Sequence, residues 1–254
     1  MGMKHLATIR QSLSGWIFPP CCAGCDAPLD TGRQIVTPFL CEHCEQTLVP
    51  IGANYCSVCG QGFELESRTS FRCANCGDRE LAIDFAVSAY RGSGVAKTLM
   101  HQFKYGKQRH LSRLFGVLLD EIWRDDRLRQ ESWWVVPVPL HPRRLRERMF
   151  NQSDELAREI IRRAPGGIQL THHHLLKRVK QTVRQAQLDR RDRLTNLSGV
   201  FETRSSLPKT PLGGARILLV DDVITTGTTV SECAAALRSK LDVATVAALS
   251  VLRG

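Results

Sequence analysis

The sequence lacks the motifs and apolar segments that mark several large protein classes. It contains neither Gly-x-x-x-x-Gly-Lys-Ser/Thr nor Gly-x-Gly-x-x-Gly, so nothing supports a nucleoside-triphosphate or dinucleotide loop. No apolar run approaches the roughly 20 residues that span a membrane. Residues 1–18 also lack the continuous apolar core of a secretory signal. Their apolar residues recur at helical spacing, which predicts an amphipathic helix.

We therefore expect a cytoplasmic protein whose thiols stay reduced. The expected N-terminal helix could pack against the rest of the protein or lie at the inner face of the membrane. Its only basic residues are Lys4, His5 and Arg10. So few cations favour packing against the protein, because attachment to an anionic lipid surface depends on positive charge.

Positive charge is concentrated in one part of the chain. Residues 1–80 carry 6 Lys and Arg against 8 Asp and Glu, a balance of −2. Residues 141–193 carry 14 against 6, which is +8 of the net charge of +10. Such a concentrated excess favours a polyanionic partner. Few aromatic residues lie among these arginines, so a nucleic-acid strand bound here would show weak base stacking and little sequence preference.

Ten cysteines are present, and their spacing is that of metal ligands. Eight form four Cys-x-x-Cys pairs, with gaps of 15 residues between the first two pairs and 13 between the last two. Each such turn directs both sulfurs at one ion, and two turns complete a tetrahedral thiolate site. The regular spacing favours structural zinc over an iron–sulfur cluster, which also takes four thiolates. The predicted ligands are Cys22, Cys25, Cys41, Cys44, Cys56, Cys59, Cys73 and Cys76.

The pairing of the four turns stays open at the level of sequence. Sequential pairing, which we favour, joins the first turn to the second and the third to the fourth. A cross-braced arrangement would join the first to the third and the second to the fourth. Cys21 competes with Cys22, but only Cys22 gives the two-residue spacing. Cys233 stands apart on a predicted helix and is expected to be a buried apolar residue.

The segment from Ile217 to Thr229 predicts a ligand site at the edge of a parallel sheet. Its first four residues are branched and apolar, which predicts a strand buried on both faces. Asp221 and Asp222 follow, at the place where open α/β folds bind ligands. A loop then leads into a helix, whose N-terminus favours an anion. A phosphate on the loop and a diol on the carboxylates describe a ribose 5-phosphate. The loop residues are Thr225, Thr226, Gly227, Thr228 and Thr229.

A second strand, predicted over Trp133 to Leu140, ends in prolines. Pro137 and Pro139 cannot donate hydrogen bonds to a sheet, so they must lie at the end of the strand. Arg143 and its neighbours follow in an expected loop, and a constrained backbone followed by arginines suits pyrophosphate. The polar run 124–131 before this strand is expected to be a solvated turn.

A long basic stretch over residues 175–201 loses its apolar periodicity. A long loop between core elements is more often functional than idle. Closure over a charged substrate is one function that such a loop performs. The candidate residues of this flexible loop are Arg178, Gln185 and Arg191.

The segment from Asp221 to Thr229 resembles the signature with which type I phosphoribosyltransferases bind phosphoribosyl pyrophosphate (PRPP). The resemblance implies that Asp221 and Asp222 are the catalytic acidic pair that holds the ribose hydroxyls. It implies that Thr225 to Thr229 hold the 5-phosphate and that Mg²⁺ accompanies the pyrophosphate.

Over nearly the whole chain, the order of motifs is similar to the ComF family of competence-associated, phosphoribosyltransferase-like proteins. One departure is Met149, where the family usually has Gly. The resemblance implies a role in natural transformation, in handling single-stranded DNA, with DNA-uptake proteins as partners. The matching motifs are the zinc module, Phe103-Lys104-Tyr105, Val136 to Leu140, Arg148-x-Phe150-Asn151-Gln152, Gln185, Arg191, Asn196, Phe201 and the Asp-Asp loop.

The expected architecture is α/β. Residues 1–80 form an N-terminal helix and a zinc module with two four-cysteine sites, and residues 81–254 form a type I phosphoribosyltransferase-like, doubly wound parallel sheet. Two functions remain open. The protein is either a phosphoribosyltransferase in which a nucleophile displaces pyrophosphate from PRPP, or a single-stranded-DNA-binding or adaptor protein that keeps a PRPP-sensing site. Completeness of the predicted site favours the first, and the concentrated charge favours the second.

Overall fold

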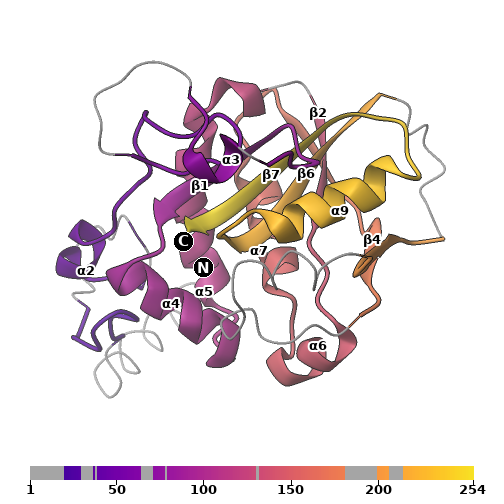
Figure 1. Ribbon diagram of the computed structural model, residues 1–254. Coiled ribbons are helices and arrows are strands. Elements are labelled where there is room, and N and C mark those ends of the chain that lie inside the picture. Colours follow the sequence, from indigo (N-terminus) through magenta and orange to yellow (C-terminus); the bar gives the residue numbers. More distant parts are fainter. Residues whose placement is uncertain are drawn as a thin grey trace, which may run out of the picture.

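The computed structural model describes residues 20–29, 37, 39–63, 71–77, 79–129, 132–180, 199–205 and 214–254. The expected helix before residue 19 lies outside this part of the chain. A central sheet carries helices on both faces, and the cysteine-rich module lies against one edge of it (Figure 1). Among the described residues, no helix combines the length and the apolar character needed to cross a membrane.

Five parallel strands form the central sheet in the order β1-β7-β6-β2-β3. The two central strands are built mainly from apolar residues, which a parallel sheet covered on both faces requires. The register pairs Val220 of β6 with Pro137 of β2 on one side and with Leu249 of β7 on the other. The strands are β1 (Phe85–Arg91), β2 (Ser132–Pro137), β3 (Gln169–His172), β6 (Ala215–Ile224) and β7 (Val243–Arg253).

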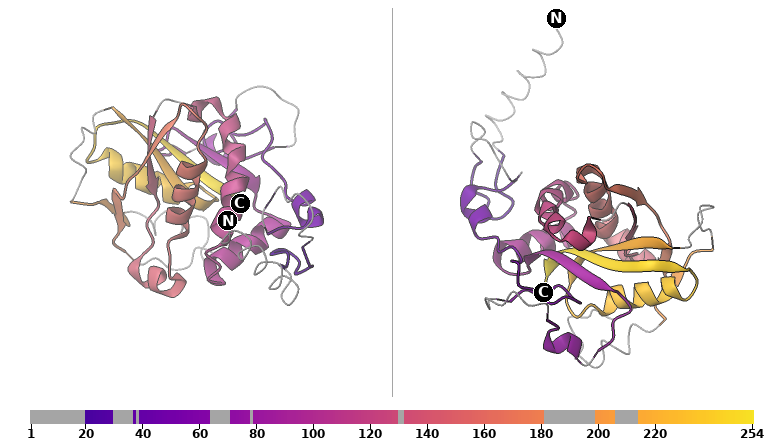
Figure 2. Two further views of the ribbon diagram at one scale, coloured as in Figure 1. Left: turned by 180° about the vertical axis from the view of Figure 1, so that it is seen from behind. Right: turned by 90° about the horizontal axis from the view of Figure 1, so that it is seen from above.

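Different elements cover the two faces of the sheet (Figure 2). Successive side chains of a strand point to opposite faces. Leu218 and Val220 accordingly pack with helices α4, α5 and α7, whereas Ile217 and Leu219 pack with α9 and the hairpin of β4 and β5. This arrangement confirms the predicted doubly wound α/β fold. The elements are α4 (Gly94–Tyr105), α5 (Leu111–Leu118), α7 (Gln152–Arg163), α9 (Thr228–Arg238), β4 (Leu176–Arg178) and β5 (Phe201–Thr203).

The cysteine-rich module covers the exposed edge of the sheet. It contains two short helices, α2 (Glu42–Gln46) and α3 (Ala74–Gly77). Backbone hydrogen bonds join it to edge strand β1, with Ile51 N donating to Ala89 O (2.9 Å) and Ala86 N donating to Val58 O (2.7 Å). An uncovered edge strand would offer unpaired backbone groups to other chains. The module therefore supplies hydrogen-bond partners for backbone groups of β1.

The expectation of a solvated turn over residues 124–131 is wrong for the described residues 124–129. They form parts of two 3₁₀ helices, η1 (Leu119–Arg124) and η2 (Asp126–Leu128). Leu128 is fully buried, and Asp125 is 4% exposed. Asp125 accepts hydrogen bonds from Tyr55 Oη (2.9 Å) and from Arg127 Nη2 (2.7 Å). The Asp125 carboxylate can be buried because Arg127 pairs with it and Tyr55 donates a hydrogen bond to it. Tyr55 lies far away in the sequence.

The segment after β2 is a helix, α6 (Pro142–Arg148), and not the expected loop. Pro142 occupies its first turn, a position where the missing N–H costs nothing. His141 caps the helix by accepting a hydrogen bond from Arg143 N at Nδ1 (3.3 Å). Helical spacing sends neighbouring arginines in different directions, so they do not form one continuous basic loop.

Candidate functional site

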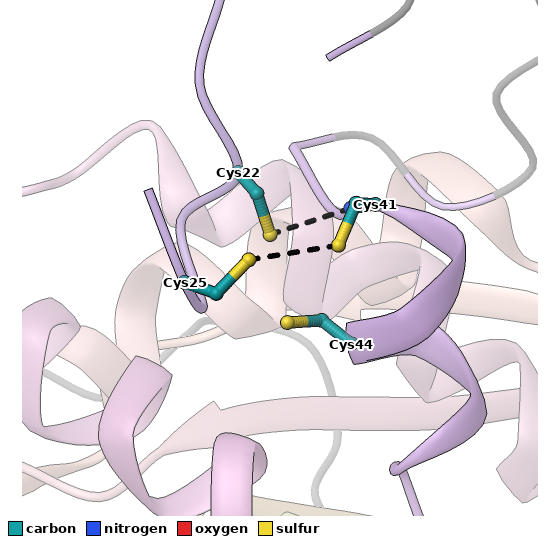
Figure 3. A group of neighbouring side chains, drawn as sticks. All are labelled: Cys22, Cys25, Cys41 and Cys44. Carbon is teal, nitrogen blue, oxygen red and sulfur yellow. Dashed lines mark hydrogen bonds between the residues drawn. The ribbon is translucent and has the colours of Figure 1, made fainter. Parts of the chain in front are cut away.

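The eight paired cysteines form two groups of four in sequential pairing. We call Cys22, Cys25, Cys41 and Cys44 the first cluster, and Cys56, Cys59, Cys73 and Cys76 the second cluster. Within each cluster the sulfurs lie within 4.8 Å of one another. Figure 3 shows the four side chains of the first cluster pointing toward one another. The Sγ atoms of Cys25 and Cys41 are 3.7 Å apart, and those of Cys59 and Cys73 are 3.6 Å apart. Zn–S bonds of about 2.3 Å in a tetrahedron place the sulfurs about 3.8 Å apart, so both clusters fit zinc.

Backbone N–H groups favour the thiolate form in both clusters. Cys22 Sγ accepts from Cys41 N (3.3 Å), and Cys56 Sγ accepts from Cys73 N (3.3 Å). Burial acts to raise the pKa of Cys22 and of Cys56, but several backbone N–H donors, these two among them, together with a neighbouring thiol outweigh it and lower each pKa to about 7. Thiolates are the metal-binding form of cysteine. Because four thiolates leave no open position, such sites are structural.

Asp221 and Asp222 lie near the end of β6, where the connections of the sheet diverge. β2 continues through α7 to β3 on one side, whereas β6 continues through α9 to β7 on the other. Adjacent strands with diverging connections leave a crevice at their carboxyl ends, which is where open α/β folds bind ligands. β2 ends at Pro137, the partner of Val220. The two carboxylates therefore lie just beyond the end of the neighbouring strand.

The two carboxylates have different partners. Lys104 Nζ lies 2.8 Å from Asp222 Oδ1. Asp221 Oδ1 accepts hydrogen bonds from Ser153 Oγ (3.2 Å) and Asp222 N (2.9 Å). Burial, followed by the charge of Asp222, raises the pKa of Asp221 to about 7. Asp221 can therefore gain or lose a proton near neutral pH.

The threonine loop joins β6 to α9, as predicted. Gly227 has φ of +76°, a conformation that favours glycine, and a Cβ on it would lie 3.2 Å from Leu81 Cδ1, which would have to shift slightly. The hydroxyls of Thr226 and Thr228 lie 2.8 Å apart. Thr225 is exposed at the end of β6, whereas Thr228 is buried at the start of α9. The loop thus brings hydroxyls and a helix N-terminus next to the two carboxylates in the chain.

Two arginines donate hydrogen bonds to this loop. Arg253, at the end of β7, donates to Ile224 O (2.9 Å) and to Thr225 O, and also to Cys59 O (3.2 Å) and Cys59 Sγ (3.3 Å). Arg79 donates to Thr226 O (3.3 Å) and to Thr228 Oγ1 (3.2 Å). Arg253 is 4% exposed. It therefore connects the second cluster to the threonine loop through buried hydrogen bonds.

A small cavity of about 100 Å³ lies beside the pair of Lys104 and Asp222. Its lining carries three cations, an acid and a phenol. Arg148 Nη1 donates to Gln152 Oε1 (2.9 Å), and its guanidinium lies over the ring of Tyr105 at 4.9 Å. These contacts fix a positive charge between α6 and α4. The lining residues are Lys104, Tyr105, Arg144, Glu147 and Arg148.

The other predicted site residues have varied surroundings. Pro139 lies half-buried between β2 and α6, and Arg143 is exposed and pairs with Glu147 at 3.1 Å. Arg178 is half-buried at the end of β4, over the ring of Phe201. Burial, followed by the positive charge of Arg144, lowers the pKa of Arg178. Gln185 and Arg191 lie outside the described residues.

Several residues of this region were not predicted as site residues. Lys104 and Arg148 belong to motifs noted in the sequence, so a signal for them existed. Arg253 had no local signal, because its contact with Cys59 spans 194 positions. Met149 ends α6 with φ of +71°. This conformation favours glycine, which explains why the family usually has Gly at this position.

Comparison with known proteins adds family evidence to this geometry. Residues 13–77 match the double zinc ribbon domain, and together with the two clusters this match supports structural zinc. The chain is 30% identical over 204 residues to Competence protein F of Haemophilus influenzae, covering 78% of this chain and 84% of that protein.

Two further relatives cover most of the chain. DNA utilization protein YhgH of Escherichia coli K12 is 28% identical over 219 residues, covering 79% of this chain and 91% of that protein. Competence protein ComFC of Bacillus subtilis is 24% identical over 224 residues, with 84% of each chain covered. The extent of these matches and the double zinc ribbon together show that the chain belongs to the ComF family.

Proposed function

We propose that this chain binds PRPP with Mg²⁺ at the segment Asp221 to Thr229. The observation that carries the proposal is a carboxylate pair followed by a helix N-terminus at the point where the sheet's connections diverge. Asp221 and Asp222 would accept hydrogen bonds from the ribose hydroxyls. The amides and hydroxyls of Thr225 to Thr229 would donate to the 5-phosphate, as helix N-termini do for anions.

The basic cavity beside Asp222 suits the pyrophosphate end of the same ligand. Lys104, Arg144 and Arg148 line it, and Arg144 and Arg148 are half-buried. Partly buried charges are screened by salt less than exposed ones, so they retain their attraction for a phosphate. Pro139 fixes the backbone that leads into α6, and Arg143 and Arg178 would add positive charge around the cavity.

The donor set also fits Mg²⁺, which takes oxygen ligands from carboxylates and phosphates. Asp221 and Asp222 supply such oxygens, and Lys104 balances part of their charge. When bound, Mg²⁺ neutralises negative charge on the pyrophosphate. The protein's own contribution is to orient the ribose and to surround the leaving group with fixed cations.

In a transfer reaction a nucleophile attacks C1′ of PRPP, the bond from C1′ to the pyrophosphate oxygen breaks, and pyrophosphate leaves with the electron pair. Lys104, Arg144 and Arg148 would stabilise the charge that develops on it. The test is an assay of PRPP-dependent pyrophosphate release, with and without single-stranded DNA. We expect release that an acceptor accelerates. Bound PRPP without any release would instead assign the site to sensing.

We further propose that the protein acts in natural transformation or DNA utilization, as a handler of single-stranded DNA. The names of the three relatives support this role, and so does the charge of α6. Arg143 and Arg146 are exposed on that helix, where they can reach a phosphate backbone, whereas Arg144 lines the cavity. DNA binding and PRPP binding would therefore use different faces of one helix.

Salt dependence separates these two uses of α6. Each phosphate contact with a single strand lowers log affinity by roughly 0.7 per unit of log salt. The Arg143→Ala/Arg146→Ala variant should weaken DNA binding and reduce this slope by roughly 1.4, with a smaller loss of PRPP affinity than Arg144→Ala causes. The matched control Arg144→Ala should do the reverse. No DNA binding at low salt, or an unchanged slope in the double variant, would contradict the DNA-handling role and leave the PRPP proposal standing.

A further inference from the structure

A group of three potential metal ligands lies outside both cysteine clusters and outside the threonine loop. Asp154 is in the first turn of α7, His172 is the last residue of β3, and His174 follows two residues later. Asp154 Oδ1 lies 3.0 Å from His172 Nε2 and 3.4 Å from His174 Nε2. All three ligand atoms lie within 4.8 Å of one another, as ligands of a single ion do.

The intervening histidine has a different environment. His173 stacks on Trp134, with ring centroids 4.1 Å apart and planes 19° apart. In extended chain, residues two apart project to the same side and the one between them projects to the other. His172 and His174 therefore converge on Asp154, while His173 packs on the indole. His172 and His174 are thus the candidate ligands, and His173 between them provides a control position for substitution.

The contact between Asp154 and His172 lacks the geometry of a regular hydrogen bond. Asp154 Oδ1 and His172 Nε2 are buried, and among the described residues neither has a hydrogen-bond partner of regular geometry, although they are 3.0 Å apart. Arg158 donates to the other carboxylate oxygen, Oδ2, at 3.2 Å. That contact leaves Oδ1 to the two imidazoles. Buried polar atoms without partners are costly, and a cation among the three would satisfy them together.

We propose that Asp154, His172 and His174 bind one divalent first-row transition-metal ion, such as Co²⁺, Ni²⁺ or Zn²⁺. Two imidazoles with one carboxylate favour such ions over Mg²⁺ and Ca²⁺, which prefer oxygen. Three protein ligands leave at least one position open, unlike the two cysteine clusters. The ion would also hold the start of α7, where the adjacent Ser153 donates to Asp221.

The test is a titration of the full-length chain, made without a polyhistidine tag, with its cysteine clusters loaded with zinc. After dialysis against a weak chelator, Co²⁺ is added and followed by calorimetry and absorption spectroscopy. We expect one further Co²⁺ per chain, with no new sulfur-to-cobalt charge-transfer bands, and no displacement by excess Mg²⁺. Absence of this additional ion in the wild type overturns the proposal.

The variants assign the ligands. His172→Ala and His174→Ala should each weaken Co²⁺ affinity at least about tenfold, since even outer-shell partners of metal ligands contribute that much. His173→Ala should bind Co²⁺ as the wild type does. Unchanged affinity in both ligand variants, or an equal loss in His173→Ala, contradicts the assignment. If thermal unfolding shows that His172→Ala is misfolded, the half-exposed His174 alone decides the outcome.

Discussion

The two cysteine clusters have the same four thiolates but differ in their surroundings. In the first cluster Cys25 is exposed and Cys41 is half-buried, whereas all four cysteines of the second cluster are buried. Buried hydrogen bonds of Arg253 link the second cluster to the threonine loop. Cys22 and Cys44 of the first cluster pack into the core that contains α4 and α5. Two zinc sites with the same ligands can therefore have different roles. The first cluster stabilises the fold, and the second stabilises the fold and also holds the proposed ligand loop.

Removing one ligand from each cluster is expected to have the largest effect. Cys76→Ser should cost the second cluster its zinc and lower the free energy of unfolding by more than about 4 kcal/mol, the range typical of a lost structural metal. Cys25→Ser should cost less, because Cys25 is exposed. Zinc content and chemical unfolding measure both. Only Cys76→Ser should also weaken PRPP binding, and equal PRPP affinities in the two variants would contradict the comparison.

Two arginines, Arg127 half-buried and Arg253 buried, distinguish the stability of the second cluster from its link to the loop. Arg127 donates to Ser57 O (2.8 Å) and pairs with Asp125, far from the loop, whereas Arg253 reaches Ile224 and Thr225. Arg127→Ala should destabilise by about 3–5 kcal/mol because it leaves Asp125 unpaired. Arg253→Ala should cost about 1–3 kcal/mol, because Cys59 O and Thr225 O lose the donor that Arg253 supplies.

PRPP affinity then distinguishes the two arginines. Calorimetry should find PRPP affinity about tenfold weaker in Arg253→Ala, or about 1.4 kcal/mol, because the loop loses the hydrogen bonds that Arg253 donates to Ile224 and Thr225. Arg127→Ala should bind PRPP as the wild type does. A larger loss of affinity in Arg127→Ala would mean that general destabilisation, and not the Arg253 link, controls the loop.

Cys22 and Cys56 in the metal-free clusters should depend on pH with the opposite sign to Asp221 of the carboxylate pair. Because their pKa values are lowered, the stability that these two thiols contribute above pH 9 is lost as pH falls toward 7. The pKa of Asp221 is raised to about 7 by burial and by Asp222. Its contribution is therefore complete at low pH, near its ordinary pKa, and is lost as pH rises through 7.

Comparison with Asp221→Asn isolates this second effect, because the cysteines are common to both proteins. Between pH 5.5 and 7.5 the variant should gain stability relative to the wild type by on the order of 1 kcal/mol. Urea unfolding at several pH values measures the difference. A difference that is flat across this range would mean that Asp221 titrates as an ordinary exposed carboxyl.

Met149 provides the smallest expected effect, at a position in neither cluster. It ends α6 with φ of +71° and is 71% exposed. Met149→Gly should raise the free energy of unfolding by up to about 1 kcal/mol, because glycine adopts this conformation without strain. Zinc content and PRPP affinity should not change. A loss of stability would show that the methionine side chain contributes packing that its exposure does not reveal.

The sequence predicted those features whose signals are local. The strand before Asp221, the threonine loop, the following helix and the spacing of the cysteines each depend on neighbouring residues. The features it missed depend on distant contacts. Asp125 is buried because Tyr55 lies beside it, and Arg253 acts on residues far away in the chain. His172 and His174 meet Asp154 only when β3 and α7 pack together, and no motif announces that.

Helix α6 shows another limit of prediction from sequence. The sequence predicts a loop for the arginines after β2, although Pro142 occupies the first turn of a helix that contains them. The helix then divides its arginines, with Arg144 and Arg148 lining the cavity and Arg143 exposed. Composition alone had singled out Arg143. Its proposed part in binding PRPP stays a prediction, because one helical turn decides which arginine reaches the cavity.

The central claim is that the segment from Asp221 to Thr229 binds a ribose phosphate, and calorimetric titration of PRPP with Mg²⁺ tests it most directly. The Asp221→Ala/Asp222→Ala variant removes both diol acceptors, and hydrogen bonds to charged groups contribute about 1.5–3 kcal/mol each. Affinity should fall at least about a hundredfold, with the fold verified by thermal unfolding. Asp126→Ala, at a side chain 90% exposed, is the control and should bind normally. Unchanged PRPP affinity in the double variant would contradict the account.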